Sequence, residues 1–200
     1  MYSRIRPWLF RLDPERAHAA TLRLLQLVGA LPPLAALVRK VSALSPEDPI
    51  DLFGLHFANR LGLAAGYDKD GLAWRGLACL GFGHIEIGTV TPHPQPGNPR
   101  PRVFRLIADQ ALINRLGFPS RGAAFVASRL RGRRPKHLIL GVNLGINKDT
   151  PLDSAADDYT ALMRIFSPLA DYLTINVSSP NTTGLLGLQQ SAPLSDLLGQ

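Results

Sequence analysis

The chain has 200 residues, of which 46% are hydrophobic and 18% charged, and 22 Lys and Arg against 15 Asp and Glu give it a formal net charge of +7. This composition excludes a disordered chain and predicts a globular protein with a substantial core in one or two domains. The single cysteine, Cys79, excludes an intrachain disulfide, and the five His show no metal-ligand spacing, so we expect no metal site.

Residues 1–45 are rich in Leu and Arg, unlike the rest of the chain. Asp13-Pro14 is a typical helix start, with the acid as N-cap and proline at the first helical position. Apolar stripes at helical spacing lie on both sides of Pro32-Pro33, which predicts a helical hairpin broken at the prolines. The hairpin either packs on the domain or lies on an anionic membrane surface with its arginines toward the headgroups.

The same N-terminal segment shows no evident signal peptide, because Pro7, Asp13, Glu15 and several Arg interrupt it. No apolar run in the sequence reaches the roughly 20 residues needed to span a bilayer. These two observations predict a cytoplasmic chain, with the reservation that residues 1–45 could associate with a membrane surface.

After a linker at 45–50, a short hairpin is expected about Gly54, and strands then alternate with helices. Such alternation implies parallel strands joined by right-handed crossovers. A long excursion at 91–119 exceeds the usual loop length and is typical of a lid or binding loop. The expected strands lie at 61–65, 84–88, 138–143 and 172–177, and the expected helices at 71–80, 120–131, 154–167 and from about 192.

This pattern gives four βα units, which fits either an open four-stranded sheet or the N-terminal part of a (β/α)8 TIM-type barrel of eight units. We favour the half barrel, because the first and fourth strands would otherwise be bare edges of an apolar parallel sheet. The chain also stops at Gln200 inside an apparent helix, so a truncated protein is expected. The predicted domains are a helical extension at 1–45 and the first half of a barrel at 46–200.

Polar residues follow all four expected strands, at Asp68-Lys69, Thr89, Asn143 and Asn176. The carboxyl ends of parallel barrel strands open onto one face, where active sites are built. Each residue alone has a simpler interpretation, since a strand-end Asn is usually a turn former and an Asp-Lys-Asp triplet is usually solvated. Their convergence on one face predicts a site for a planar ring with mixed N–H and C=O edges.

Two further segments add chemistry to that face. Ser178 and Ser179 have no visible His-Asp partners for hydrolysis, but a serine in a dry site can act as a base if a hydrogen-bond chain carries its proton away. In the long excursion, Asn114-Arg115 precedes Gly117, which would suit an oxo-acid substrate or would simply form a turn.

Motifs in this order resemble those of the dihydroorotate dehydrogenase family along nearly the whole chain. The helical N-terminal extension resembles the class 2, quinone-dependent and membrane-associated branch, and serine at 179 agrees, because class 1 enzymes use cysteine there. The matching segments are Leu61–Gly71, Ile85–Pro92, Gln95–Asn98, Asn114–Phe118, Asn147–Thr150 and Ile175–Thr182.

The resemblance implies an FMN-binding barrel that oxidises dihydroorotate to orotate in pyrimidine biosynthesis with a membrane quinone as acceptor. Ser179 would remove the C5 proton while a hydride leaves C6 for the flavin. The implied cofactor residues are Ala65, Gly66, Tyr67, Asp68, Lys69, Thr89, Asn143 and Asn176. The implied substrate residues are Lys69, Asn114, Arg115, Leu116, Gly117, Phe118, Asn176 and Asn181, and those near the quinone are His18 and Arg105.

The resemblance also implies a peripheral membrane protein, bound through residues 1–45 to the cytoplasmic face of a bacterial-type inner membrane. Family members continue through four more strands, with a second flavin-contacting Lys and the phosphate cradle. We therefore expect these 200 residues alone to bind FMN poorly and to turn over slowly or not at all.

Two alternatives remain at this point. The chain could be a non-catalytic half-barrel that serves as an interaction module. Its charge also allows a nucleic-acid binder, but the basic run 129–136 reads more simply as a solvated loop, and no aromatic-basic interleaving supports that function. No nucleic-acid partner is therefore expected.

Overall fold

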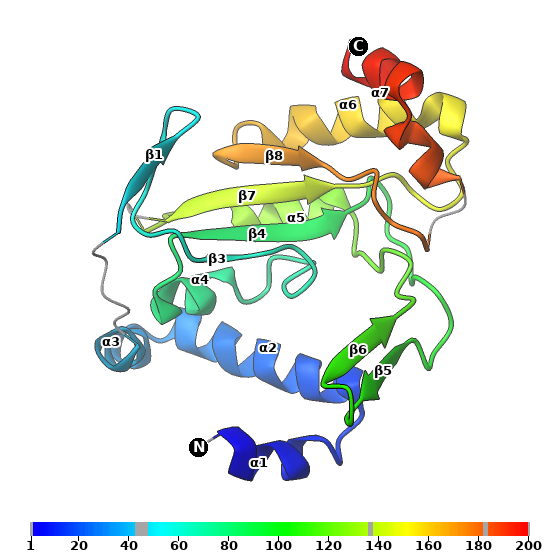
Figure 1. The fold of residues 1–200 in the computed structure, drawn as a ribbon. Coiled ribbons are helices and arrows are strands. Elements are labelled where there is room, and N and C mark those ends of the chain that lie inside the picture. Colours follow the sequence, from blue (N-terminus) through cyan, green and yellow to red (C-terminus); the bar gives the residue numbers. More distant parts are fainter. Residues whose placement is uncertain (1, 43–47, 136–137, 182–183, 200) are drawn as a thin grey trace.

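The centre of the protein is a four-stranded parallel sheet in the strand order β3-β4-β7-β8, seen in a computed structural model (Figure 1). The structure describes residues 2–42, 48–135, 138–181 and 184–199. Neighbours in space are also successive parallel strands in sequence, as expected for part of a barrel. The strands are β3 (Gly62–Leu63), β4 (His84–Val90), β7 (Ile139–Leu144) and β8 (Tyr172–Ile175).

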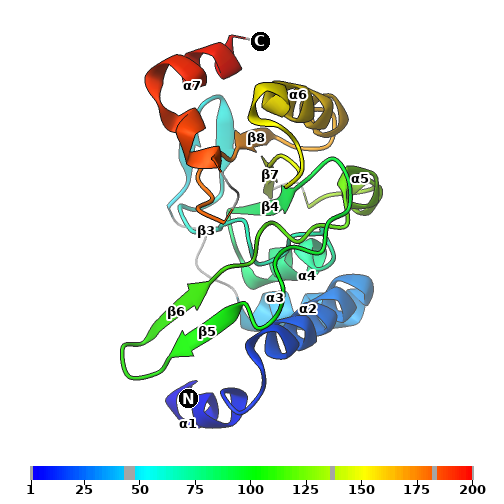
Figure 2. The ribbon, with the colours of Figure 1, turned by 90° about the vertical axis from the view of Figure 1, so that its right-hand side faces the viewer.

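Three helices lie along one side of this sheet (Figure 2). Alternate side chains of β4, among them Ile85 and Ile87, are fully buried and belong to the same core cluster as Trp74, Leu162 and Phe166. The intervening side chains face the other side of the sheet and are polar, as with Glu86. The helices are α4 (Trp74–Leu77) with the 3₁₀ helix η1 (Ala78–Leu80), α5 (Ala123–Leu130) and α6 (Ala155–Phe166) with η2 (Leu152–Ser154).

The N-terminal segment forms α1 (Tyr2–Leu9), α2 (Pro14–Ala30) and α3 (Pro32–Val41). The predicted start of α2 is confirmed, because the Asp13 carboxylate accepts a hydrogen bond of 3.0 Å from the Arg16 N–H. The predicted break at the two prolines is confirmed: α2 ends at Ala30, the chain turns at Leu31, and the prolines form the first turn of α3. Proline fits there because the first-turn N–H groups have no helical partner.

Helix α2 packs on α4 at very short range. A Cβ atom added at Gly76 would lie 1.9 Å from the Leu25 carbonyl oxygen, so only glycine permits this approach. Cys79 is buried in a second cluster with Val28 and Ala35. One face of the helical hairpin thus packs on the domain.

The opposite face of the hairpin is apolar and exposed, and it includes Leu24, Leu27, Leu37 and Val41. Within the described residues, no single helix has the length and apolar character needed to cross a bilayer. Among the helices that the structure describes, α2 and α3 taken together meet that criterion, and they are bent by 109° at their junction.

Two antiparallel hairpins flank the sheet. The hairpin predicted about Gly54 is confirmed, as β1 (Ile50–Leu52) pairs with β2 (Leu55–Phe57), whereas residues 43–47 of the expected linker lie outside the described residues. The excursion 91–119 contains a hairpin that the sequence did not predict, in which β5 (Val103–Leu106) pairs with β6 (Ala111–Asn114).

Other predicted elements are present with shifted bounds. The expected strand 61–65 shortens to Gly62–Leu63, and the expected helix 71–80 begins only at Trp74. Its start moves because the Asp68 carboxylate accepts the Leu72 and Ala73 N–H groups and holds them in a turn. The 3₁₀ helix η3 (Leu185–Gln189) and α7 (Ser191–Leu198) complete the described chain, and residues 136–137 of the basic run and 182–183 are not described.

Candidate active site

A cavity of about 380 Å³ opens at the carboxyl ends of the sheet strands. Its wall combines the loop after β3, the end of β4, the end of β7, the loop after β8 and the end of the β5–β6 excursion. Most residues proposed for the cofactor and substrate line this single cavity. They are Ala65, Gly66, Lys69, Thr89, Asn114, Leu116, Gly117, Phe118, Asn143, Asn176, Ser179 and Asn181.

Three strand-end side chains form one hydrogen-bonded network on the cavity floor. The Asn143 amide oxygen accepts from the Thr89 hydroxyl at 2.7 Å and from the Asn176 amide at 2.9 Å. The Asn176 amide also donates to Thr89 Oγ1 at 3.1 Å. These bonds fix which way both amides point, since a flipped amide would place a donor against a donor or an oxygen against an oxygen.

Glu86 completes this network and was missed by the sequence analysis. Its carboxylate accepts from the Asn143 amide at 2.8 Å and from the Tyr172 and Thr174 hydroxyls at 3.0 Å each. Burial, and secondly the nearby Glu86 charge, raise the pKa of the Tyr172 hydroxyl, which keeps it a donor. The sequence did contain a signal for Glu86. It lies between Ile85 and Ile87, and because side chains alternate along a strand, it faces the polar side of β4.

Tyr159 holds the backbone of Asn176 from the helix side of the sheet. This buried side chain of α6 donates its hydroxyl to the Asn176 carbonyl oxygen at 2.9 Å. Burial raises the pKa of the Tyr159 hydroxyl, so it remains protonated and bonded. The helix layer therefore fixes the backbone at the point where β8 turns into the serine-containing loop.

The two serines of that loop have different surroundings. The Ser178 hydroxyl and N–H both donate to the Asn176 amide oxygen, at 2.9 and 3.0 Å. Ser179 lines the cavity, and its Oγ accepts the Asn181 N–H at 3.2 Å. A donor directed at Oγ favours negative charge there, as a serine base requires.

Lys69 lies between this cavity and a second one. Its ammonium donates to the Gly66 carbonyl oxygen, and burial lowers the pKa of the Lys69 ammonium below its usual value. Gly66 has a φ of +106°, a conformation that side-chain-bearing residues rarely adopt, so glycine is needed where the loop turns back to give its carbonyl to Lys69.

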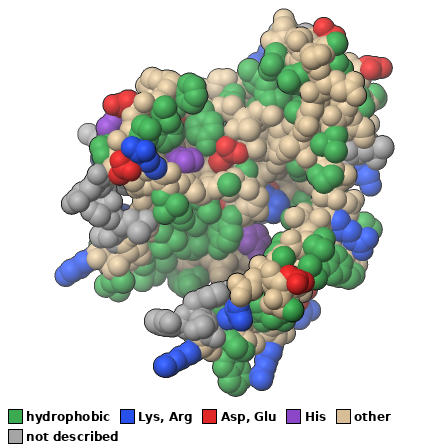
Figure 3. All heavy atoms as spheres, in the orientation of Figure 1, with side chains coloured by type: hydrophobic (Ala, Val, Ile, Leu, Met, Phe, Trp, Pro, Cys, Tyr) green, Lys and Arg blue, Asp and Glu red, His purple; other side chains and the backbone are tan. Residues whose placement is uncertain are grey.

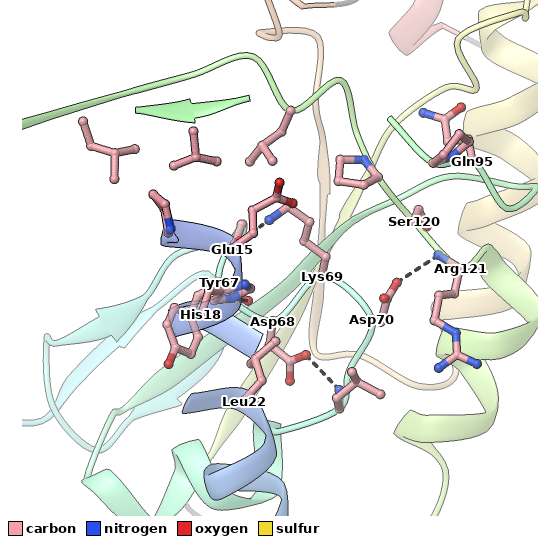
Figure 4. A pocket seen from close by; sticks show the side chains of 18 of the residues that line it. Glu15, His18, Leu22, Tyr67, Asp68, Lys69, Asp70, Gln95, Ser120 and Arg121 are labelled. Atoms are coloured by element: carbon pink, nitrogen blue, oxygen red, sulfur yellow. Dashed lines mark hydrogen bonds between the residues drawn. The ribbon is translucent and has the colours of Figure 1, made fainter. Parts of the chain in front are cut away.

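The second cavity, of about 600 Å³, lies between α2, the loop after β3 and the β5–β6 hairpin (Figure 4). The proposed quinone residues His18 and Arg105 both line it. His18 Nε2 lies 2.6 Å from the Tyr67 carbonyl oxygen, which accepts when Nε2 carries the proton. Burial, opposed by this bond, lowers the pKa of His18 and favours a neutral ring. Both cavities share the lining residues Gly66, Lys69, Leu116 and Pro119.

Three of the predicted cofactor and substrate residues do not line the first cavity. The Tyr67 hydroxyl donates to Thr21 Oγ1 at 2.8 Å, toward α2. Burial raises the pKa of the Asp68 carboxyl, whose oxygens accept backbone N–H groups ahead of α4. The Arg115 guanidinium donates to the Pro101 carbonyl oxygen at 3.0 Å. Their side chains hold the surrounding loops, and Tyr67 and Asp68 border the second cavity.

Arg102 is a second residue that the sequence analysis missed. Its side chain is buried, donates to Glu15 at 2.9 Å and to the Pro96 and Asn98 carbonyl oxygens at 2.6 and 3.0 Å. It therefore holds the start of α2 against the excursion that carries Asn114 and Phe118. The sequence gave no signal that Arg102 is buried, because a charged residue in an apparent loop is usually exposed.

Comparison with known proteins decides the family. The family model described as dihydroorotate dehydrogenase matches residues 49–200. The chain belongs to the dihydroorotate dehydrogenase family. Similar curated relatives, both named dihydroorotate dehydrogenase (quinone), come from Roseiflexus sp. strain RS-1 (55% identical, covering 99% of this chain and 55% of the relative) and Acidithiobacillus ferrooxidans (56% identical, covering 98% and 54%).

Solved structures agree with this assignment to the dihydroorotate dehydrogenase family. The crystal structure of DHODH from Eimeria tenella in complex with ferulenol has a TM-score of 0.82 and 42% identity to this chain. It covers 94% of this chain, which in turn covers 50% of that protein. The fold prediction of a partial barrel is thereby confirmed, and the chain spans about half the length of the curated relatives it matches.

Proposed function

We propose that this chain supplies the flavin- and substrate-binding half of a quinone-dependent dihydroorotate dehydrogenase, which oxidises dihydroorotate to orotate in pyrimidine biosynthesis. The observation that carries the proposal is that Lys69, Thr89, Asn143, Asn176 and Ser179, from four separate strand ends, line one cavity. Family membership alone would not require these particular side chains to meet.

The cavity has features suited to FMN. Ala64, Ala65 and Gly66 form a wall of small residues, on which a flat ring can lie close to the backbone. Ala65, Gly66, Thr89, Asn143 and Asn176 would hold the cofactor through backbone groups and the amide network. When bound there, FMN would supply the acceptor for the hydride leaving C6 of dihydroorotate.

The substrate would lie between the flavin site and the loop that carries Ser179. Lys69 would balance the substrate carboxylate, and Asn114, Gly117 and Asn181 would hydrogen-bond its polar edges. Ser179 Oγ would take the proton from C5 while its own hydroxyl proton leaves along a hydrogen-bond chain to solvent. One Oγ lone pair is bonded to the Asn181 N–H, and another is available to the substrate. Phe118 and Leu116 would exclude water from this step.

The electron acceptor would enter through the second cavity. Its lining by His18 and Arg105, and the four residues that it shares with the first cavity, support a quinone close to the flavin edge. The exposed apolar face of α2 and α3, with Arg16, Arg23, Arg39 and Lys40 in the same segment, supports peripheral binding to an anionic membrane. In a bacterial cell this would be the cytoplasmic face of the inner membrane.

Ser179→Ala tests the chemical step in a protein that carries this sequence at the full length of its relatives. Anaerobic mixing with dihydroorotate should bleach the flavin roughly 10²–10⁴-fold more slowly than in the parent, with the oxidised flavin spectrum unchanged. Ser178→Ala is the matched control and should retain a rate within a few-fold of the parent. Equal rates for Ser179→Ala and the parent would contradict the assigned base.

A further inference from the structure

The β5–β6 hairpin presents an apolar face that no described element covers. Cross-strand pairing places Phe104 beside Ile113 and Leu106 beside Ala111, so these side chains share one face of the ribbon. Ile107 and Ile113 are 56% and 54% exposed. The other face, with Val103, borders the second cavity, which we have proposed as the quinone site.

The hairpin is fastened to the turn that follows α1. The Arg105 guanidinium donates to the Leu12 carbonyl oxygen at 2.7 Å and lies over the Phe10 ring, 4.7 Å from its centroid. Figure 2 shows the hairpin turn and α1 along the same end of the molecule. The turn end of the hairpin, with Leu106 and Ile107, therefore lies beside α1.

The positive charges on this surface indicate which kind of partner it would bind. A cleft of about 390 Å³ between α1 and the hairpin turn is bordered by Arg6 and Arg105 and by the apolar Phe10, Leu106 and Ile107. Two guanidiniums above apolar walls match a phospholipid, whose anionic headgroup adjoins acyl chains. Asp109 is the only acidic residue between 103 and 114.

Helix α1 has the side chains of a bilayer interface. Trp8 is 66% exposed, and the Arg11 guanidinium lies 4.3 Å from its ring centroid. Tryptophan and arginine favour the headgroup level, where an apolar body and a polar end are both solvated. Ile5 and Leu9 of α1 are also exposed, and Figure 3 shows hydrophobic and basic side chains mixed at this end of the molecule.

We propose that α1 and the β5–β6 hairpin form one binding surface for an anionic phospholipid bilayer, with Ile107 and Ile113 inserted among the acyl chains and a headgroup held between Arg6 and Arg105. This inference rests on the proposed membrane association and extends it from residues 1–45 to a segment of the barrel domain. Membrane contact is thereby placed beside the mouth of the second cavity, since Arg105 and Leu112 border both spaces.

Vesicle flotation tests the hairpin's contribution with the 200-residue chain. Parent protein should float with phosphatidylglycerol/phosphatidylcholine vesicles, and Ile107→Gln combined with Ile113→Thr should lower the partition coefficient at least about tenfold through lost apolar burial. Ile165→Gln is the matched control, because this exposed isoleucine lies on α6, at the opposite end from α1 in Figure 1, and should bind like the parent.

Tryptophan quenching by brominated acyl chains separates the inference from the proposed function. Ile107→Trp combined with Trp8→Phe reports on the hairpin, native Trp8 reports on α1, and fully buried Trp74 gives a constant background. We expect quenching of both the new hairpin indole and Trp8. Quenching of Trp8 alone would overturn the hairpin inference and leave the proposed membrane association intact, whereas absence of flotation and of any quenching would overturn both.

Two further outcomes would also overturn the inference. The first is equal flotation with pure phosphatidylcholine, since the two guanidiniums would then have no headgroup charge to recognise. The second is self-association of the parent that the double hairpin variant abolishes without any loss of flotation, because the face would then serve a second copy. If the double variant fails to fold, the quenching experiment still decides.

Discussion

The strand-end cavity and the surface formed by α1 and the β5–β6 hairpin use the same chain in opposite ways. In the cavity, Thr89, Asn143 and Asn176 come from three different strands, and neighbouring groups satisfy their polar atoms. On the surface, Trp8 and Ile107 have large exposed fractions. The cavity therefore depends on long-range register, whereas the surface depends on side chains that stay exposed.

Because of this difference, mutations in the cavity network should change protein stability, whereas mutations on the exposed surface should change membrane binding. A residue of the cavity network should change the free energy of unfolding, because its loss strands buried polar groups. A residue of the exposed surface should leave folding unchanged and affect only association. The following substitutions test this separation, from the largest expected effect to the smallest.

The largest effect is expected at the buried Arg102–Glu15 pair. Arg102→Met should lower the free energy of unfolding by about 3 kcal/mol, because Glu15 Oε1 and two carbonyl oxygens lose their buried partner. Arg100→Met is the matched control, since Arg100 pairs with the same carboxylate but is 71% exposed, and should cost less than about 0.5 kcal/mol. Urea unfolding of both variants checks this; equal costs would refute the role given to burial.

The next effect is expected at Glu86. Glu86→Ala should destabilise the fold by about 2 kcal/mol, because the Asn143 amide, Tyr172 and Thr174 lose their shared acceptor. The Asn143 amide would also become free to turn, so orotate or FMN affinity should fall more than stability alone explains. Calorimetric titration beside urea unfolding measures both in a protein that carries this sequence at the full length of its relatives, and Asp109→Ala serves as an exposed acidic control. Unchanged affinity would show that Glu86 does not position the site.

His18 should make stability depend on pH. Its folded pKa is lowered by burial, so the unfolded chain binds more protons between the folded pKa and the usual value near 6.5. This contribution to stability is complete above about pH 6.5 and is lost as pH falls toward the folded pKa. Urea unfolding at several pH values should show a shallower dependence in His18→Gln; an identical pH profile would contradict a buried neutral ring.

The smallest effect is expected on the outer face of α2. Leu24 is 60% exposed, and Leu24→Ala should change the free energy of unfolding by less than about 0.5 kcal/mol. The adjacent Leu25 packs against the main core, so Leu25→Ala should cost about 2 kcal/mol. Thermal and urea unfolding compare the two variants. Similar losses would mean that both faces of the helix are buried in solution.

Much of the site could be predicted because it depends on the ends of regular elements. Thr89, Asn143 and Asn176 each follow an apolar strand, and parallel connections bring such ends to one edge. The N-cap at Asp13 was equally readable, since its side chain acts only three residues away. These are local signals combined with a topology that has few alternatives.

The residues that were missed depend on contacts without a local signal. The β5–β6 turn has Gln110 at a φ of +50° in place of the glycine that would have marked a hairpin. Glu86 and Arg102 are charged residues whose partners lie far away in sequence. The lining role expected of Arg115 failed for a related reason, because the Pro101 carbonyl binds its guanidinium outside the cavity. Which of several possible partners a charged side chain binds is decided by tertiary packing.

The most direct test of the account is a crystal structure, grown with FMN and orotate, of a protein that carries this sequence at the full length of its relatives. We predict that Lys69, Asn143 and Asn176 contact the bound molecules in the strand-end cavity, with Ser179 Oγ within about 3.5 Å of orotate C5. Ligand density at another place, or Ser179 and Asn143 directed away from it, would contradict the claim that these strand ends form one site.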